Sequence, residues 1–158
     1  MSRNALLDRM SAHGSDDLAT PLYAAKTISP YLRGVLWEPM PGEGVLVGHL
    51  RSLGHTVIPG VEDFFIATPP TGAECVVSNP PFSKKAKVLA RCRELGLPWA
   101  MLLPVSALGS HACQKSLDGA EIVALKKRVN YTNGSGCWFS SAWFTWGLGL
   151  PTQLVFAG

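Results

Sequence analysis

Short apolar runs alternate with amphipathic stretches along the first two thirds of the chain. The pattern predicts strands at 35–38, 55–58, 73–77 and 100–105, and helices at 20–33, 44–53 and 83–95. The stretch 59–72 holds turn formers around a brief strand at 64–66, and the last third predicts a short helix near 111–117 and strands at 121–125, 143–146 and 154–156. Alternating strands and helices run parallel, because each helix returns the chain to the same edge of the sheet. We therefore predict an α/β fold: a mostly parallel central sheet with an antiparallel C-terminal edge strand and helices on both faces.

Composition narrows the class of protein further. With 158 residues, 47% of them hydrophobic and 16% charged, the chain is expected to form one globular domain with a real core. Its net charge of +3 mildly favours an anionic partner. The sequence shows no apolar signal core and no run long enough to span a membrane, so we expect a cytoplasmic protein without a membrane partner.

The four cysteines argue against a metal site. Cys75, Cys92, Cys113 and Cys137 are widely spaced and form no Cys-x-x-Cys pair. Cysteines spaced in this way in a cytosolic chain are more often reduced core residues than zinc ligands or a disulfide frame. We therefore expect no bound metal.

The tetrapeptide Asn79-Pro80-Pro81-Phe82 follows the strand predicted at 73–77 and precedes the helix at 83–95. Open α/β sheets place their ligand chemistry at this carboxyl end of the strands. The two prolines fix the backbone and remove two amide donors, which leaves carbonyls free to accept hydrogen bonds. With an Asn amide and an aromatic ring beside them, these carbonyls suit a flat ring that carries an exocyclic amine. The plainer alternative is a proline-rich turn that ends a strand.

A glycine-containing loop, Glu38-Pro39-Met40-Pro41-Gly42-Glu43-Gly44, lies between the first strand and its helix. Glycines there let the backbone approach a ligand closely, and the amino terminus of the helix offers free amides. An acidic residue just before the loop can hold a cationic group of that ligand. A plain strand-to-helix turn is the alternative for this loop taken alone.

Together these motifs resemble those of the DNA N6-adenine methyltransferases, especially the small phage-borne enzymes. That family carries an acidic-Pro-x-x-Gly-x-Gly loop after the first strand and an [Asp/Asn/Ser]-Pro-Pro-[aromatic] motif later, and this chain matches both. Thr20-Pro21, Asp63-Phe64 and the Trp-rich segment 141–146 are further matches. The resemblance spans about residues 16–157. It implies a single Rossmann-like methyltransferase domain over 1–158, with a disordered lead at 1–15 and no separate target-recognition domain.

The resemblance implies S-adenosylmethionine as the cofactor. Its methionine half would lie against Thr20-Pro21 and the glycine loop, with Glu38 near the amino group, and its adenine ring would lie against Asp63 and Phe64. The family's acid after the second strand is missing here, because the connection is short, so Glu62 is expected to take the ribose. The predicted cofactor-binding residues are Thr20, Pro21, Glu38, Pro39, Gly42, Gly44, Glu62, Asp63, Phe64 and Asn79. Thr20 as a helix cap and Asp63 as a solvated loop acid are the plainer alternatives.

The same resemblance implies that Asn79, Pro80, Pro81 and Phe82 are catalytic. Asn79 and the Pro80 carbonyl would accept the two hydrogens of an adenine N6 amine, and Phe82 would stack on a base flipped out of the duplex. Methylation at cytosine C5 needs a covalent cysteine nucleophile. No cysteine follows a proline in this chain, so that chemistry is excluded.

The expected partner is DNA, with RNA as the alternative. Basic residues after the catalytic motif and near 126–128 could contact phosphate, although a solvated helix face explains them equally, and the polar stretch 130–136 could reach the same partner. The predicted nucleic-acid-binding residues are Lys84, Lys85, Lys87, Lys127 and Arg128, beside Lys126. Sequence specificity should be loose, or supplied by short loops or a homodimer. Two other functions stay open: methylation of an RNA purine amine, and a degenerate domain that binds nucleic acid or cofactor without turnover.

Overall fold

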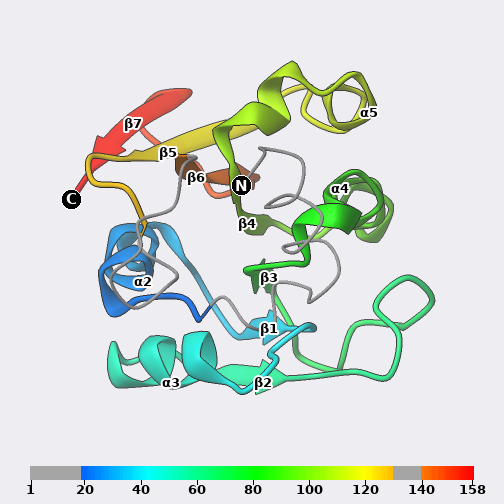
Figure 1. Cartoon of the computed structure of the whole chain (residues 1–158). Helices are drawn as coiled ribbons and strands as arrows, with labels where there is room; N and C mark the ends of the chain where they lie inside the picture. Colours follow the sequence, from blue (N-terminus) through cyan, green and yellow to red (C-terminus); the bar gives the residue numbers. More distant parts are fainter. Residues whose placement is uncertain (1–18, 130–139) are drawn as a thin grey trace, which may run out of the picture.

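A seven-stranded sheet in the order β2-β1-β3-β4-β6-β5-β7 forms the centre of the molecule (Figure 1). The computed structural model describes residues 19–129 and 140–158. The strands are β1 (Leu36–Glu38), β2 (Val57–Pro59), β3 (Cys75–Ser78), β4 (Trp99–Pro104), β5 (Glu121–Leu125), β6 (Ser141–Trp146) and β7 (Leu154–Ala157). The helices are α2 (Leu22–Ile28), α3 (Val45–Ser52), α4 (Lys85–Leu95) and α5 (His111–Gln114), with 3₁₀ turns η2 (Ser29–Tyr31), η3 (Phe82–Lys84) and η4 (Val105–Gly109).

The sheet is mostly parallel, as predicted. β1 pairs in parallel with β2 and β3, β3 with β4, and β5 with β7. The antiparallel strand is β6, and it lies inside the sheet between β4 and β5 rather than at the edge. Its first five residues are buried, which an internal position with a partner on each side explains. The C-terminal edge is β7.

Helices cover both faces of the sheet, which confirms the predicted α/β class. Alternate strand residues point to opposite faces. Leu36, Val77, Leu102 and Trp143 belong to the core under α2 and α3, whereas Trp37, Val76, Met101 and Phe144 belong to the core under α4 and α5. Figure 1 shows α2 and α3 on one side of the sheet and α4 and α5 on the other.

Three local expectations were wrong. Residues 64–66 form a turn and not a brief strand, so 60–74 crosses from β2 to β3 without regular structure and β2 is the edge of the sheet. Thr20 does not cap the first helix: the N-cap is Pro21, and no side chain accepts a hydrogen bond there. The helix is also shorter than predicted, because Pro30 lies in the 3₁₀ turn that follows Ile28.

The direction of the strand order reverses between β1 and β3. From β1 the chain moves outward to β2, and from β3 it moves outward in the other direction to β4. Such a reversal opens a crevice beyond the carboxyl ends of the two central strands, which is where open α/β sheets bind ligands. Here those ends are Glu38 and Ser78, each followed by one of the two motifs.

The other sequence expectations concern cysteines, metals and membranes. Cys75, Cys92 and Cys113 are free and buried, and Cys137 lies outside the described residues. Within 19–129 and 140–158, no group of three or more His, Cys, Asp or Glu side chains is placed to hold a metal ion. Among the same residues no helix has the length and apolar character to cross a bilayer. The predicted lead at 1–15 and the polar stretch 130–136 also lie outside the described residues.

Candidate active site

A pocket of about 40 Å³, open to solvent, lies at the crevice between β1 and β3. Three segments far apart in the sequence form it: the residues before α2, the β1–α3 loop with the start of α3, and the residue after β3. Its lining is Ala19, Thr20, Glu38, Met40, Pro41, Gly42, Glu43, Val45, Leu46 and Asn79. Four predicted residues from these three segments, Thr20, Glu38, Gly42 and Asn79, therefore share one cavity. Pro21, Gly44, Pro80 and Phe82 do not line it.

Glu38 lies at the end of β1 and is 1% exposed. Its Oε1 accepts a hydrogen bond from the backbone N–H of Met40 at 2.8 Å. Burial raises the pKa of Glu38 to about 8. Hydrogen bonds from the Ser78 hydroxyl and from the backbone amides of Met40 and Asn79 lower the same pKa, but by less than burial raises it. A buried carboxyl with a pKa near neutrality is well suited to take a cation, because a positive charge beside it favours its ionised form.

Asn79 is held by Thr20. Its Nδ2 donates to Thr20 Oγ1 at 3.0 Å, and both side chains are at least nine-tenths buried. Because the amide is planar, fixing Nδ2 also fixes Oδ1 at the opposite end of the group. The sequence predicted both residues but not this contact, which joins positions 59 residues apart.

The two prolines leave one backbone acceptor available. The Pro81 carbonyl accepts the N–H of Lys84 at 3.0 Å and begins the turn η3. No backbone or side-chain donor in the described part of the chain bonds the Pro80 carbonyl. Phe82 is half-buried and touches the cores on both faces of the sheet, so its ring stands at the border between them.

The glycine loop adopts backbone conformations that favour glycine. Gly42 has φ of 52° and Gly44 has φ of 82°, both in the left-handed region, and the Gly44 N–H closes a turn on Pro41 O at 2.8 Å. A Cβ at Gly44 would meet no atom within 4 Å. The constraint at Gly44 is therefore its dihedral angle, and the space above it is open.

Alanine substitutions at two glycines should change stability in opposite directions. We expect Gly44→Ala to destabilise the protein by about 1–2 kcal/mol, the cost of a left-handed conformation for a residue with a Cβ. Gly48 is an exposed helical residue of α3 whose Cβ would also meet nothing within 4 Å, so Gly48→Ala should stabilise by about 0.5–1 kcal/mol. Urea unfolding of the two variants measures both; a Gly44→Ala variant as stable as the wild type would contradict the strained loop.

A second, wider cavity of about 490 Å³ adjoins the first and shares Met40, Pro41 and Gly42 with it. It extends toward the 63–67 turn and the motif Asn79-Pro80-Pro81-Phe82, and its other lining residues are Pro39, Val61, Glu62, Asp63, Phe64, Phe65, Pro81 and Lys84. The two cavities together form a bent trough across the glycine loop. Glu62 lies exposed at its rim.

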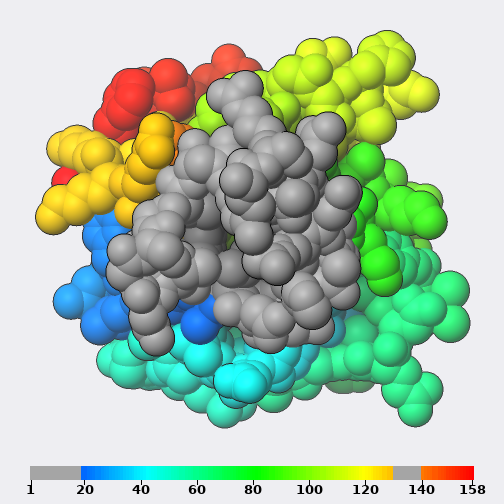
Figure 2. Space-filling view, in the orientation of Figure 1, coloured from blue at the N-terminus to red at the C-terminus, as the bar shows by residue number. Residues whose placement is uncertain are grey.

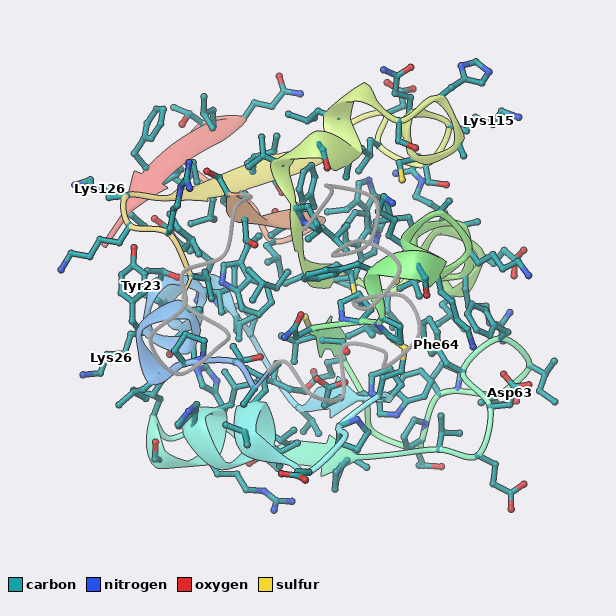
Figure 3. The ribbon with its side chains drawn as sticks, in the orientation of Figure 1. Tyr23, Lys26, Asp63, Phe64, Lys115 and Lys126 are labelled. Atoms are coloured by element: carbon teal, nitrogen blue, oxygen red, sulfur yellow. The ribbon has the colours of Figure 1, made fainter. Side chains whose placement is uncertain are left out.

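The Asp63-Phe64 pair lies in this second cavity, but its two members differ in exposure. Asp63 is exposed, and its Oδ1 accepts the N–H of Phe65 at 2.9 Å. Phe64 is 3% exposed and packs its ring edge on Trp37 at 5.7 Å between centroids. Figure 3 shows Phe64 nearer the sheet and Asp63 farther out. Phe65, which the sequence did not single out, is the half-exposed ring, with Lys84 Nζ 6.0 Å from its centroid.

The basic residues form two clusters. Lys84 caps α4 just after the motif Asn79-Pro80-Pro81-Phe82, and Lys85 and Lys87 lie in its first turn. Lys126, Lys127 and Arg128 are exposed after β5. The N–H of Lys127 donates to the Tyr23 hydroxyl at 3.0 Å, so the second cluster lies against α2. Figure 2 shows residues 126–129 beside α2 at the surface. Because β3 and β5 are parallel, both clusters lie at the same carboxyl edge of the sheet as the pocket.

No family model matches this chain, and no curated protein sequence matches it. Several solved structures are similar to it. A predicted O-methyltransferase, Atu636 of Agrobacterium tumefaciens, gives a TM-score of 0.51 at 12% identity over 87% of this chain and 84% of that chain. The 23S rRNA methyltransferase ErmE gives a TM-score of 0.49 at 18% identity over 92% of this chain and 67% of that chain. Precorrin-6y C5,15-methyltransferase of Geobacter metallireducens GS-15 gives a TM-score of 0.42 at 14% identity over 84% of this chain and 93% of that chain. The first of these shows that the chain has a fold found in methyltransferases.

Proposed function

We propose that this protein transfers a methyl group from S-adenosylmethionine to the N6 amine of adenine in DNA. One observation carries the proposal: the amide of Asn79, oriented by Thr20, shares a pocket with the buried carboxyl of Glu38. An amine-accepting group and a cation-accepting group thereby lie at adjacent strand ends. The fold supports the proposal, because a predicted O-methyltransferase shares it.

The residues of the trough fit S-adenosylmethionine. The buried Glu38 would hold the ammonium group, and the open space at Gly44 would let the methionine half lie against the loop. In the wider cavity the exposed Glu62 and Asp63 would take the ribose and ring, with the half-exposed Phe65 as the aromatic face. When bound, the cofactor supplies a methyl group made electrophilic by its sulfonium.

The chain's own residues would prepare the acceptor. The lone pair of an aromatic amine is delocalised into its ring, which makes the amine a poor nucleophile. Asn79 Oδ1 and the Pro80 carbonyl would accept its two hydrogens and draw it toward tetrahedral geometry, which localises the lone pair. Fixed acceptors of this kind act through positioning and electrostatics. Phe82 would stack on the flipped base.

The two basic clusters support a polyanionic substrate. β3 and β5 are three strand spacings apart in the sheet, so their carboxyl ends lie about 15 Å from one another along its edge. A DNA strand carries one phosphate per ~3.4 Å of helix axis, so an edge of this length faces several phosphates. The clusters that follow the two strands would contact phosphates on either side of a flipped base.

Neutralising the cluster after β5 should weaken DNA binding in a salt-dependent way. We expect the double variant Lys126→Gln/Lys127→Gln to bind DNA at least about tenfold more weakly at 0.1 M salt. The slope of the logarithm of the binding constant against the logarithm of the salt concentration should become shallower by about two, one for each phosphate contact. The backbone hydrogen bonds of both residues, to Ala157 and Tyr23, do not depend on their side chains. Lys115→Gln is the control, because that exposed lysine follows α5, away from the cluster (Figure 3). Fluorescence anisotropy over a salt series measures the slope; equal slopes in the two variants would contradict the proposed phosphate contacts.

A methyl-transfer assay tests the proposed function directly. Tritiated S-adenosylmethionine is incubated with unmethylated duplex DNA, single-stranded DNA, RNA and protein, and the digested nucleosides are separated by chromatography. The expected result is label in N6-methyldeoxyadenosine. Label in RNA alone would overturn the DNA assignment in favour of RNA methylation. No label in any pool, with no heat of cofactor binding, would favour a domain without turnover.

A further inference from the structure

We infer that Arg91 is a positioning residue for the cofactor: it holds the 63–67 turn in place, and the turn forms one wall of the wider cavity. The inference rests on the proposed function, because it assigns that wall to the adenosine half of S-adenosylmethionine. Arg91 belongs to α4 and does not line the cavity. It would act only through the backbone that it holds.

The guanidinium of Arg91 makes three interactions. Its Nε donates to the Phe64 carbonyl at 3.2 Å, and its Nη2 donates to the Ala67 carbonyl at 2.7 Å. Its Nη1 pairs with Glu94 Oε2 at 3.0 Å, one turn further along the helix. The side chain is 19% exposed, so its bonds are largely shielded from water. It therefore joins both ends of the turn to a helix packed on the sheet.

The turn needs such support because the sheet gives it none. β2 is the edge strand and ends at Pro59, and no strand or helix forms before β3 begins at Cys75. The turn's own hydrogen bonds are local: Asp63 Oδ1 accepts from Phe65, and the Asp63 carbonyl accepts from Ala67. These bonds give the turn its shape but do not fix its place. The Phe64 ring on Trp37 anchors one point, and Arg91 anchors the backbone.

Arginine suits this task better than lysine. Its planar group presents five donors in a fixed fork, which can reach two carbonyls and a carboxylate at once. The pair with Glu94 restrains the orientation of the fork. A lysine would reach one of the two carbonyls. The arrangement therefore predicts that the fork, and not the positive charge alone, is required.

The test compares Arg91→Met and Arg91→Lys with Arg93→Met. Arg93 lies on the same helix and stacks on Trp146 at 5.3 Å, away from the turn, so its variant controls for the loss of an arginine from α4. Calorimetry gives the Kd for S-adenosylmethionine and for 5′-methylthioadenosine, which has the adenosine half but no amino-acid group. Hydrogen exchange at the Phe65 and Ala67 amides in the ligand-free protein reports the turn itself.

We expect Arg91→Met to raise both Kd values by the same factor, about tenfold, and to speed exchange at the two amides. The Kd values of Arg91→Lys should lie between those of Arg91→Met and the wild type. The Kd values of Arg93→Met should stay within twofold of the wild type. At saturating cofactor the kcat of Arg91→Met should stay within about twofold of wild type, because the catalytic motif is intact.

Two results would overturn the inference. If Arg91→Met lowers Tm but leaves both Kd values within twofold, Arg91 only stabilises the fold. If Arg91→Met does not fold, Arg91→Lys is tested in its place, and both of its Kd values within twofold of wild type would overturn the inference. A wild-type protein that binds neither ligand would overturn the proposed function and this inference together, whereas normal wild-type binding with unchanged variants overturns this inference alone.

Discussion

Asn79→Ala is expected to lower the rate of methyl transfer by about 10²–10³-fold while the Kd for S-adenosylmethionine stays within about threefold. The substitution removes the Oδ1 acceptor, and losing one preorganised hydrogen-bonding group at a reacting centre typically costs this much in rate. The cofactor keeps Glu38, the glycine loop and the 63–67 turn. Single-turnover assays at saturating cofactor and calorimetry separate the two effects.

Two further variants show whether orientation of the amide matters. Asn79→Asp keeps two acceptor oxygens, and the Thr20 hydroxyl can donate to one of them, so substantial transfer should remain. Thr20→Val keeps the shape but removes the hydroxyl that holds Nδ2, so its rate should fall between wild type and Asn79→Ala. Full activity in Asn79→Ala would refute the proposed role of the motif.

Glu38→Gln is expected to weaken S-adenosylmethionine binding by two to three orders of magnitude and yet to stabilise the ligand-free protein at alkaline pH. Glutamine can still accept the Met40 N–H, so the loop keeps its geometry. It cannot pair with an ammonium group, and removing one partner of a buried ion pair costs about 3–5 kcal/mol. Binding of 5′-methylthioadenosine, which lacks that group, should not change.

The stability effect follows from the raised pKa of Glu38. Its folded value, about 8, lies above the ordinary 4.5, so between these values the folded state binds more protons than the unfolded state. The stabilisation from this group is complete below pH 4.5 and is lost as pH rises through 8, by at most about 1.4 kcal/mol per unit. Urea unfolding from pH 5 to 8.5 should show this fall in the wild type and not in Glu38→Gln.

Cofactor binding should be linked to the same proton. An ammonium group beside Glu38 favours the carboxylate, so binding below pH 8 should release a proton and tighten as pH rises. Calorimetry in buffers of different ionisation enthalpy measures that release. If the release and the pH dependence of stability are the same in wild type and Glu38→Gln, Glu38 is not the linked group.

Much of the fold could be predicted because it depends on local patterns. Alternating apolar runs predicted the strands, and β5 begins and ends at the predicted residues, Glu121 and Leu125. The position of β6 could not be predicted in this way, since the choice of neighbours within a sheet is made by tertiary packing. Trp143 illustrates this: its indole N–H donates to the Ala24 carbonyl at 2.9 Å, a contact across 119 residues.

The same distinction between local patterns and long-range contacts applies to the candidate site. Glu38, Gly42 and Asn79 lie in motifs whose chemistry is visible in the sequence, and the structure brings them to one trough. Their catalytic and cofactor-binding roles stay predictions. The contacts that orient the trough have no local pattern: Arg91 has the sequence context of a solvated helix face.

The direction of β6 has a consequence for how such a protein could acquire new specificity. Because β6 runs against its neighbours, its first residue pairs with Pro104 at the edge where β5 ends, which is also the edge of the sheet where β3 ends before Asn79. Val129 and Ser140 therefore bracket a point at which extra sequence would be delivered to the substrate side without altering the register of any strand. A lineage could lengthen or exchange the sequence between these two residues while the sheet and its core were inherited intact, and under the proposed function this would change what is methylated.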